Sequence, residues 1–154
     1  MMIGMLVNIL ITILVFIFME FFAWFAHKYI MHGFLWSLHK DHHQVNHDHK
    51  FQKNDYFFLI FAIPSIILFV LGSKDFNYMF FSGLGIALYG MAYFIIHEII
   101  IHRRLPAPSK TKSKYIKAIR KAHKIHHKNR NKDHCVNSVS YTHLTLPTKR
   151  GWVV

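Results

Sequence analysis

The stretch IGMLVNILITILVFIFMEFFAWF, residues 3–25, decides the fold of this chain. It contains 23 residues and a single charge, Glu20. A helix of this length spans roughly 34 Å at about 1.5 Å per residue, which is enough to cross the core of a bilayer. The run is not typical of a signal peptide, because no Lys or Arg precedes it and no small-x-small cleavage site follows it. We therefore expect a membrane-spanning helix near the amino terminus.

Two further apolar runs follow. Residues 56–71 form a run of 16 closed by Gly72, which is short for a span and could also be a re-entrant or buried helix. Residues 78–96 form an uncharged run of 19 that leads directly into His97 and Glu98. The polar residues 72–77 separate the two runs and predict a tight turn.

The composition supports a membrane protein. Hydrophobic residues make up 53% of the chain and aromatic residues 16%, which excludes a disordered chain. The alternative, three core helices of a soluble protein, is disfavoured because few amphipathic segments are present to cover them. The single cysteine, Cys135, excludes an internal disulfide framework and a cysteine-rich zinc fold. We expect an all-α integral membrane bundle of about three apolar helices with a histidine-rich helical cap, formed by residues 1–135.

The positive charges predict the orientation of the bundle. The chain has 19 Lys and Arg against 7 Asp and Glu. Four of the basic residues lie in residues 26–55, one lies in the 72–77 turn, and 14 follow residue 101. Three crossings place both basic segments on one side, and the positive-inside rule makes that side cytoplasmic. The histidine-rich cap is therefore expected in the cytoplasm.

Ten of the 14 histidines fall into four compact groups. The order is pair, triplet, long apolar insert, pair, triplet, with the same spacing within both pairs and within both triplets. The groups are His27 and His32; His39, His42 and His43; His97 and His102; and His123, His126 and His127. A lone histidine is usually an ordinary surface residue, as we expect of His47, His49, His134 and His143, but a repeated spacing indicates a metal site.

Helical geometry explains the triplets. On an α-helix, His39, His42 and His43 lie at about 0°, 300° and 40°, so that all three share one face. The members of each pair lie about 140° apart, which predicts that the pairs straddle a helix end at the membrane surface. Ten imidazoles are too many for one ion and enough for two. Imidazole suits iron, zinc, copper and nickel, whereas calcium and magnesium prefer oxygen ligands.

Carboxylates are scarce near these groups, so the pattern is not that of a glutamate-rich di-iron bundle. Glu20, Asp41 and Glu98 are the candidates for orienting a histidine ring by accepting a hydrogen bond from it. Glu20 lies seven residues before His27 and within about 20° of the same helix face. It could equally be a helix-packing acid bonded to another segment.

The histidine-bearing segments resemble a known superfamily. They read HKYIMHGFLWSLHKDHH at residues 27–43, HEIIIHRR at 97–104 and AHKIHHK at 122–128. These boxes resemble those of the fatty acid hydroxylase / sterol desaturase superfamily of membrane di-iron enzymes. The run MHGFLWSLH at residues 31–39 resembles its carotenoid branch, the bacterial β-carotene 3-hydroxylases. The resemblance covers roughly residues 15–133.

The resemblance implies that the ten histidines ligate two iron ions. It implies an O₂-dependent reaction that hydroxylates C3 of each β-ionone ring of β-carotene and gives zeaxanthin through β-cryptoxanthin. Electrons would come from NAD(P)H through ferredoxin and its reductase, at the bacterial inner membrane. The chain departs from the family at residues 136–154, which resemble a translated sequencing adapter and are expected to be a non-native or unstructured tail. The family is also often drawn with an additional membrane segment.

The residues alone support the same class of chemistry. No glycine-rich nucleotide loop is present, so electrons must come from a partner. The basic segment 110–132 could dock an acidic electron carrier, bind anionic lipid, or be a solvated helix. Little aromatic interleaving disfavours nucleic acid. A sterol, fatty-acid or sphingolipid hydroxylase or desaturase remains an alternative. A metal transporter is less favoured, because it should carry ligands near the membrane midplane and on both faces. A structural membrane protein is also less favoured, because the histidine spacing is repeated.

Overall fold

The computed structural model describes residues 2–44, 51–104, 110–128 and 132, which contain helices and connecting segments and no strand. The elements are α1 (Met2–Phe25), the π-helix η1 (Ala26–Phe34), α2 (Trp36–His43), the 3₁₀-helix η2 (Lys53–Phe57), α3 (Phe58–Gly72), α4 (Tyr78–Tyr93), the π-helix η3 (Phe94–Ile101) and α5 (Lys114–Lys128). The predicted all-α class is confirmed. The tail at residues 136–154 lies outside the described residues.

Three helical segments are long and apolar enough to cross a membrane: Ile3–Phe34, Lys53–Gly72 and Tyr78–Ile101. The second has 20 residues rather than 16, because η2 extends α3 at its amino-terminal end. Only 6% to 17% of the residues in the apolar windows are buried within the protein. Helices this apolar and this exposed need a lipid environment, which argues against the soluble alternative.

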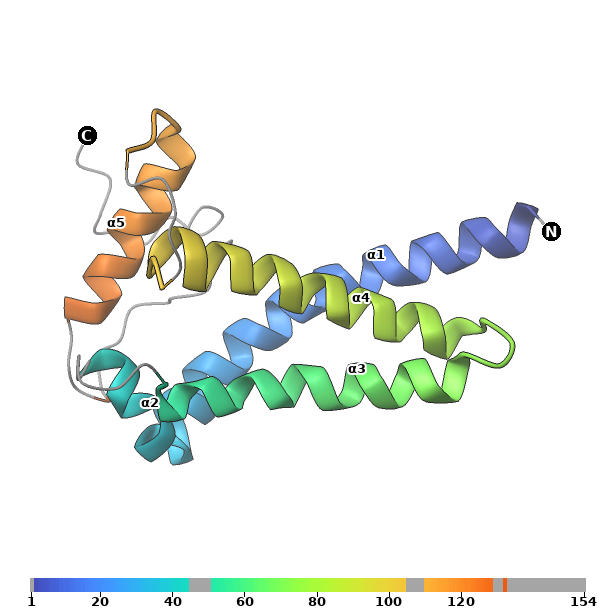
Figure 1. Ribbon diagram of the computed structural model, residues 1–154, viewed down its shortest axis with the longest axis horizontal. Helices are drawn as coiled ribbons and strands as arrows, with labels where there is room; N and C mark the ends of the chain where they lie inside the picture. The colour runs from blue at the N-terminus through green and yellow to red at the C-terminus, as the bar shows by residue number, and fades with distance from the viewer. Residues whose placement is uncertain (1, 45–50, 105–109, 129–131, 133–154) are drawn as a thin grey trace.

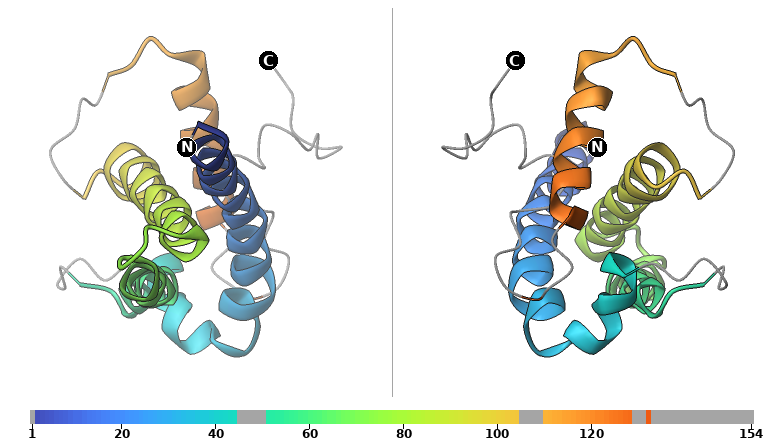
Figure 2. Two further views of the ribbon diagram at one scale, coloured as in Figure 1. Left: turned by 90° about the vertical axis from the view of Figure 1, so that its right-hand side faces the viewer. Right: turned by 90° about the vertical axis from the view of Figure 1, so that its left-hand side faces the viewer.

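The three long segments lie side by side as a bundle (Figures 1 and 2). α3 and α4 form an antiparallel hairpin around the turn at residues 72–77, and α1 packs against α4. The amino terminus and this turn lie at one end of the bundle, whereas α2 and α5 lie at the other (Figure 1). The segments that carry the histidines therefore share one end.

Small residues allow the helices to approach closely. A Cβ atom on Gly85 would lie 2.8 Å from the carbonyl oxygen of Thr12, so α1 and α4 are in contact there. The Ser65 hydroxyl donates to the carbonyl oxygen of Gly83 at 2.9 Å and joins α3 to α4. Close backbone approach and hydrogen bonds between helices are the usual source of helix association in lipid.

Glu20 also connects two helices. The Tyr89 hydroxyl donates to its Oε2 at 2.8 Å, from the centre of a small core formed by Tyr89, Met19 and Ala23. This bond is the interhelical alternative considered for Glu20. Its predicted role toward His27 stays a prediction. The bond also aligns the ends of α1 and α4 from which η1 and η3 emerge.

We expect Gly85→Ala to destabilise the bundle, because the added methyl group would collide with the backbone of α1. Overpacking of this kind typically costs roughly 1–3 kcal/mol. Gly90→Ala on the same helix is the matched control, since nothing lies within 4 Å of a Cβ at that position. Denaturant unfolding in detergent would compare the two variants, and equal stabilities would contradict the close packing.

Candidate metal centre

The structure gathers the histidines of all four groups at one end of the bundle. Two sets have ligand atoms within 4.8 Å of one another: His27, His32, His39, His43 and His126 in the first set, and His42, His97, His102 and His123 in the second. His127 lies beside both, with its Nε2 2.8 Å from that of His123 and its ring stacked on that of His43 at 4.8 Å. The two sets together bring the four histidine groups, which the sequence separates, into one cluster, as a shared metal site would require. That these histidines bind metal is a proposal.

The middle histidine of each triplet belongs to the set whose other members come from the opposite half of the chain. His42 of α2 lies with the second set, and its ring centroid is 4.5 Å from that of His102. His126 of α5 lies with the first set, and its ring centroid is 4.5 Å from that of His43. Neither set is therefore complete within one half of the sequence. The order of the boxes gave no sign of this exchange.

Each histidine pair is joined by a π-helical turn. His27 and His32 both lie inside η1, whereas His97 lies in η3 and His102 caps its carboxyl end, so only the second pair straddles a helix end as expected. In η3 the backbone N–H of His102 donates to the carbonyl of His97, five residues earlier, at 2.9 Å. This wider turn places residues five apart on the same face, so the rings of His97 and His102 lie 4.6 Å apart. The pair in η1 has the same arrangement, with rings 4.7 Å apart. The ideal α-helix was the wrong template for these pairs.

The triplets follow the α-helical prediction. His39, His42 and His43 are all buried on one face of α2. The Nε2 atoms of His39 and His43 lie 3.2 Å apart, and those of His123 and His102 lie 2.8 Å apart. Neighbouring nitrogen ligands are about 3 Å apart around an ion whose bonds are about 2.1 Å long. The nitrogen spacing therefore fits metal binding.

Oxygen acceptors set the orientation of three rings. The Nδ1 of His39 lies 2.6 Å from Asn54 Oδ1, and that of His42 lies 3.1 Å from Gln52 Oε1. An amide oxygen only accepts, so these Nδ1 atoms carry the proton and leave Nε2 with a free lone pair. The Nδ1 of His97 lies 2.6 Å from Glu98 Oε1, as expected for a ring-orienting acid.

Sequence reasoning missed Gln52 and Asn54, which no spacing distinguishes from other polar residues of the loop. Asp41 contacts this segment. It accepts hydrogen bonds from the backbone N–H groups of Lys53 and Asn54 at 2.5 and 3.4 Å. Asp41 thus holds Asn54 against α2. The predicted orienting effect of Asp41 on a histidine ring would therefore act through Asn54, on His39. His47, His49, His134 and His143 lie outside the described residues.

Burial keeps at least five of the imidazoles neutral. Desolvation, the largest cause, lowers the pKa of His39 and of His127 to about 3 and that of His102 to about 2. Desolvation and repulsion between neighbouring rings also hold the pKa of His42 and His123 well below the usual value. These groups are neutral at pH 7, which is the form that binds metals.

Comparison with known proteins adds to this geometry. Residues 12–145 match the model of the family described as fatty acid hydroxylase. No solved structure is significantly similar to the chain.

Three curated relatives are named as β-carotene hydroxylases. A β-carotene hydroxylase of Paracoccus sp. (strain PC1) is 37% identical over 129 residues, which cover 83% of this chain and 79% of the relative. A β-carotene hydroxylase of Pantoea ananas is 38% identical over 130 residues, or 84% of this chain and 74% of the relative. A chloroplastic β-carotene 3-hydroxylase of an Oncidium hybrid cultivar is 41% identical over 115 residues, covering 71% of this chain and 37% of the relative.

We expect the metal-free protein to lose stability as the pH falls from about 6.5 toward about 3. Histidines of the unfolded chain take up protons near pH 6.5, whereas the buried ones stay neutral, so acid favours the unfolded state. A histidine whose pKa in the folded protein is about 3, such as His39, lowers the free energy of unfolding by about 2 kcal/mol between pH 7.5 and pH 5. Thermal unfolding in detergent with a chelator would measure this, and equal midpoints at the two pH values would contradict it.

Proposed function

The chain belongs to the fatty acid hydroxylase family, and on that premise we propose that it is a membrane monooxygenase that hydroxylates C3 of the β-ionone rings of β-carotene. The products are β-cryptoxanthin and then zeaxanthin. The observation that carries the proposal is the 37–38% identity with bacterial β-carotene hydroxylases, over about three quarters or more of both chains. The name of the Oncidium relative supports position 3 of the ring.

The proposed cofactor is a pair of non-haem iron ions. The first would be held by His27, His32, His39, His43 and His126, and the second by His42, His97, His102 and His123, with His127 beside both. Imidazole suits iron, and the nitrogen spacing fits such an ion. When bound, iron supplies the dioxygen chemistry that inserts oxygen into an unactivated C–H bond.

The protein's own groups prepare this site. Asn54, Gln52 and Glu98 accept from Nδ1 of their histidines and keep each Nε2 available. Burial excludes water from the rings. Burial also lowers the pKa of His39 to about 3, so that this ring is unprotonated at neutral pH. The site lies at the end of three lipid-exposed helices, which suits a substrate that is dissolved in the bilayer.

The sidedness and the electron donor are part of the proposal. The excess of Lys and Arg in the histidine-bearing segments favours a cytoplasmic site in a bacterial inner membrane. α5 turns His123 and His126 inward, while Lys117, Lys121 and Lys124 are exposed. This exposed basic face supports docking of an acidic, ferredoxin-type donor that carries electrons from NAD(P)H. O₂ is the proposed co-substrate.

Expression in bacteria that accumulate β-carotene, followed by pigment chromatography, tests the activity. Zeaxanthin is the expected product. Unchanged β-carotene would refute the carotenoid assignment and favour another lipid hydroxylase or desaturase of the family.

We expect His42→Ala and His126→Ala to abolish zeaxanthin formation, because each change removes the one imidazole that its half of the chain contributes to the other set. Bound iron per chain should fall in both variants. His47→Ala is the control. This residue is near His43 in sequence, lies outside the described residues, and tests the spacing pattern against local histidine density.

Pigment yield and iron content, both normalised to expression, are the measurements. A wild-type yield of zeaxanthin from His42→Ala or His126→Ala would falsify the ligand assignment. Normal iron with no product would contradict ligation by that residue and indicate a role in substrate positioning.

A further inference from the structure

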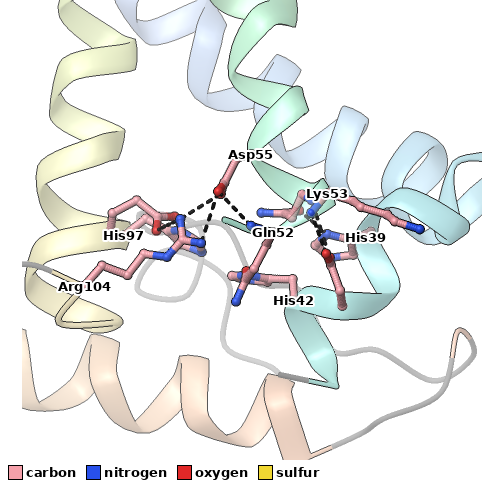
Figure 3. Close-up of polar contacts among 10 residues, drawn as sticks. His39, His42, Gln52, Lys53, Asp55, His97 and Arg104 are labelled. Atoms are coloured by element: carbon pink, nitrogen blue, oxygen red, sulfur yellow. Dashed lines mark hydrogen bonds and ion pairs between the residues drawn. The ribbon is translucent and has the colours of Figure 1, made fainter. Parts of the chain in front are cut away.

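A chain of polar contacts outside the histidines joins the two halves of the site. At its centre, Arg104 Nη1 lies 2.7 Å from Asp55 Oδ1, and Arg104 Nη2 lies 3.2 Å from Asp55 Oδ2. Asp55 belongs to η2, and Arg104 follows η3. Figure 3 shows the guanidinium and the carboxylate facing each other across the space between these segments. A two-point contact of this kind fixes direction as well as distance.

Each end of the chain of contacts reaches a histidine. Arg104 Nη1 also lies 3.0 Å from Glu98 Oε2, while the other oxygen of Glu98 is bonded to His97 Nδ1. Asp55 Oδ2 accepts from the backbone N–H of Gln52 at 3.0 Å, while the Gln52 side chain is bonded to His42 Nδ1. His42 and His97 belong to the same set.

We propose that Arg104 and Asp55 are positioning residues for the metal of the second set, and that they act by fixing Glu98 and Gln52 against His97 and His42. We call these four residues, Glu98, Arg104, Asp55 and Gln52, the clasp. The inference rests on the proposed function, because it takes the second set to hold a metal. The clasp is needed because His42 reaches this set from the other half of the chain.

The backbone supports this role. Arg103 has a φ of 55°, in the left-handed region that favours glycine, and the N–H of Arg104 donates to the carbonyl of Glu98 at 3.0 Å. The chain thus folds back at the end of η3 and brings Arg104 beside Glu98. A non-glycine residue in this conformation is strained, and the strain is tolerated where it orients a functional side chain.

The ion pair between Arg104 and Asp55 contributes little to overall stability. The side chains of Arg104 and Asp55 are 29% and 31% exposed, and ion pairs this accessible to solvent stabilise a fold only weakly. The effect should therefore appear in metal binding and not in unfolding. Groups that orient metal-binding histidines typically change metal affinity about 10–100-fold.

Asn54 provides a matched comparison. It is adjacent to Asp55, but its side chain is bonded to His39, a member of the first set. Two neighbouring residues of η2 therefore support different sets. Loss of Asn54 should affect the first metal, and loss of Asp55 the second.

The test is titration of metal-free full-length protein in nanodiscs with Co²⁺, whose binding is followed optically. Wild type should bind in two resolvable steps. Asp55→Asn and Arg104→Gln should each weaken one step about 10–100-fold and leave the other within about twofold. The double variant should be no weaker than either single variant, because both remove the same clasp. Arg104→Lys, which keeps the charge without the fork, should be intermediate.

Asn54→Ala should weaken the opposite step from Asp55→Asn. Lys74→Gln, which removes a cation from the turn at the far end of the bundle, should change neither step. The unfolding midpoint of each metal-free clasp variant should equal that of Lys74→Gln.

Two unchanged steps in Arg104→Gln would overturn the clasp, and so would additive effects in the double variant. Equal weakening of both steps with a lowered unfolding midpoint would overturn it in favour of a structural role. If Arg104→Gln does not fold, Arg104→Lys is the deciding variant. Wild-type metal affinities in Arg104→Lys would show that the two-point contact of the guanidinium with Asp55 is not needed, and would overturn the clasp. A wild type that lacks two binding steps would refute the two-metal function itself, which is a separate result.

Discussion

The exchange of His42 and His126 between the two histidine sets is the constraint on which the rest of the structure depends. For these rings to cross, α2 and α5 must meet at one end of the bundle, although they come from opposite halves of the chain. The hairpin of α3 and α4 returns the chain to that end. The start of η2, between α2 and α3, then supplies amide oxygens that orient two of the buried rings.

The spacing of α1 and α4 is set well away from the histidines. Gly85 allows the two backbones to touch, and the bond between Tyr89 and Glu20 holds the helices together closer to the site. η1 and η3 continue directly from these helices, so their separation determines how far apart the two pairs lie. Packing within the apolar region is thereby linked to the geometry of the polar end.

Much of this arrangement could be predicted from the sequence. Long apolar runs predict helices because length and hydropathy are local properties, and the triplets share a face because α-helical geometry is regular. The wider turn that joins the members of each pair could not be predicted, because a π-helical turn leaves no clear mark in the residues. The exchange and the roles of Gln52, Asn54 and Arg104 depend on contacts between distant segments, such as the pairing of residues 55 and 104. Residue types and spacing within a single segment do not reveal which residue of a distant segment it will contact.

The crossing of the two histidines also orders events during synthesis of the protein. His126 follows His42 by 84 residues and lies in the last helix that the structure describes. On the proposed ligand assignment, a nascent or prematurely terminated chain that ends before His123 has neither set complete, even after all three apolar helices have left the ribosome. Iron acquisition is then a late step in biogenesis. An incomplete polypeptide in the membrane would lack the assembled centre that reacts with oxygen.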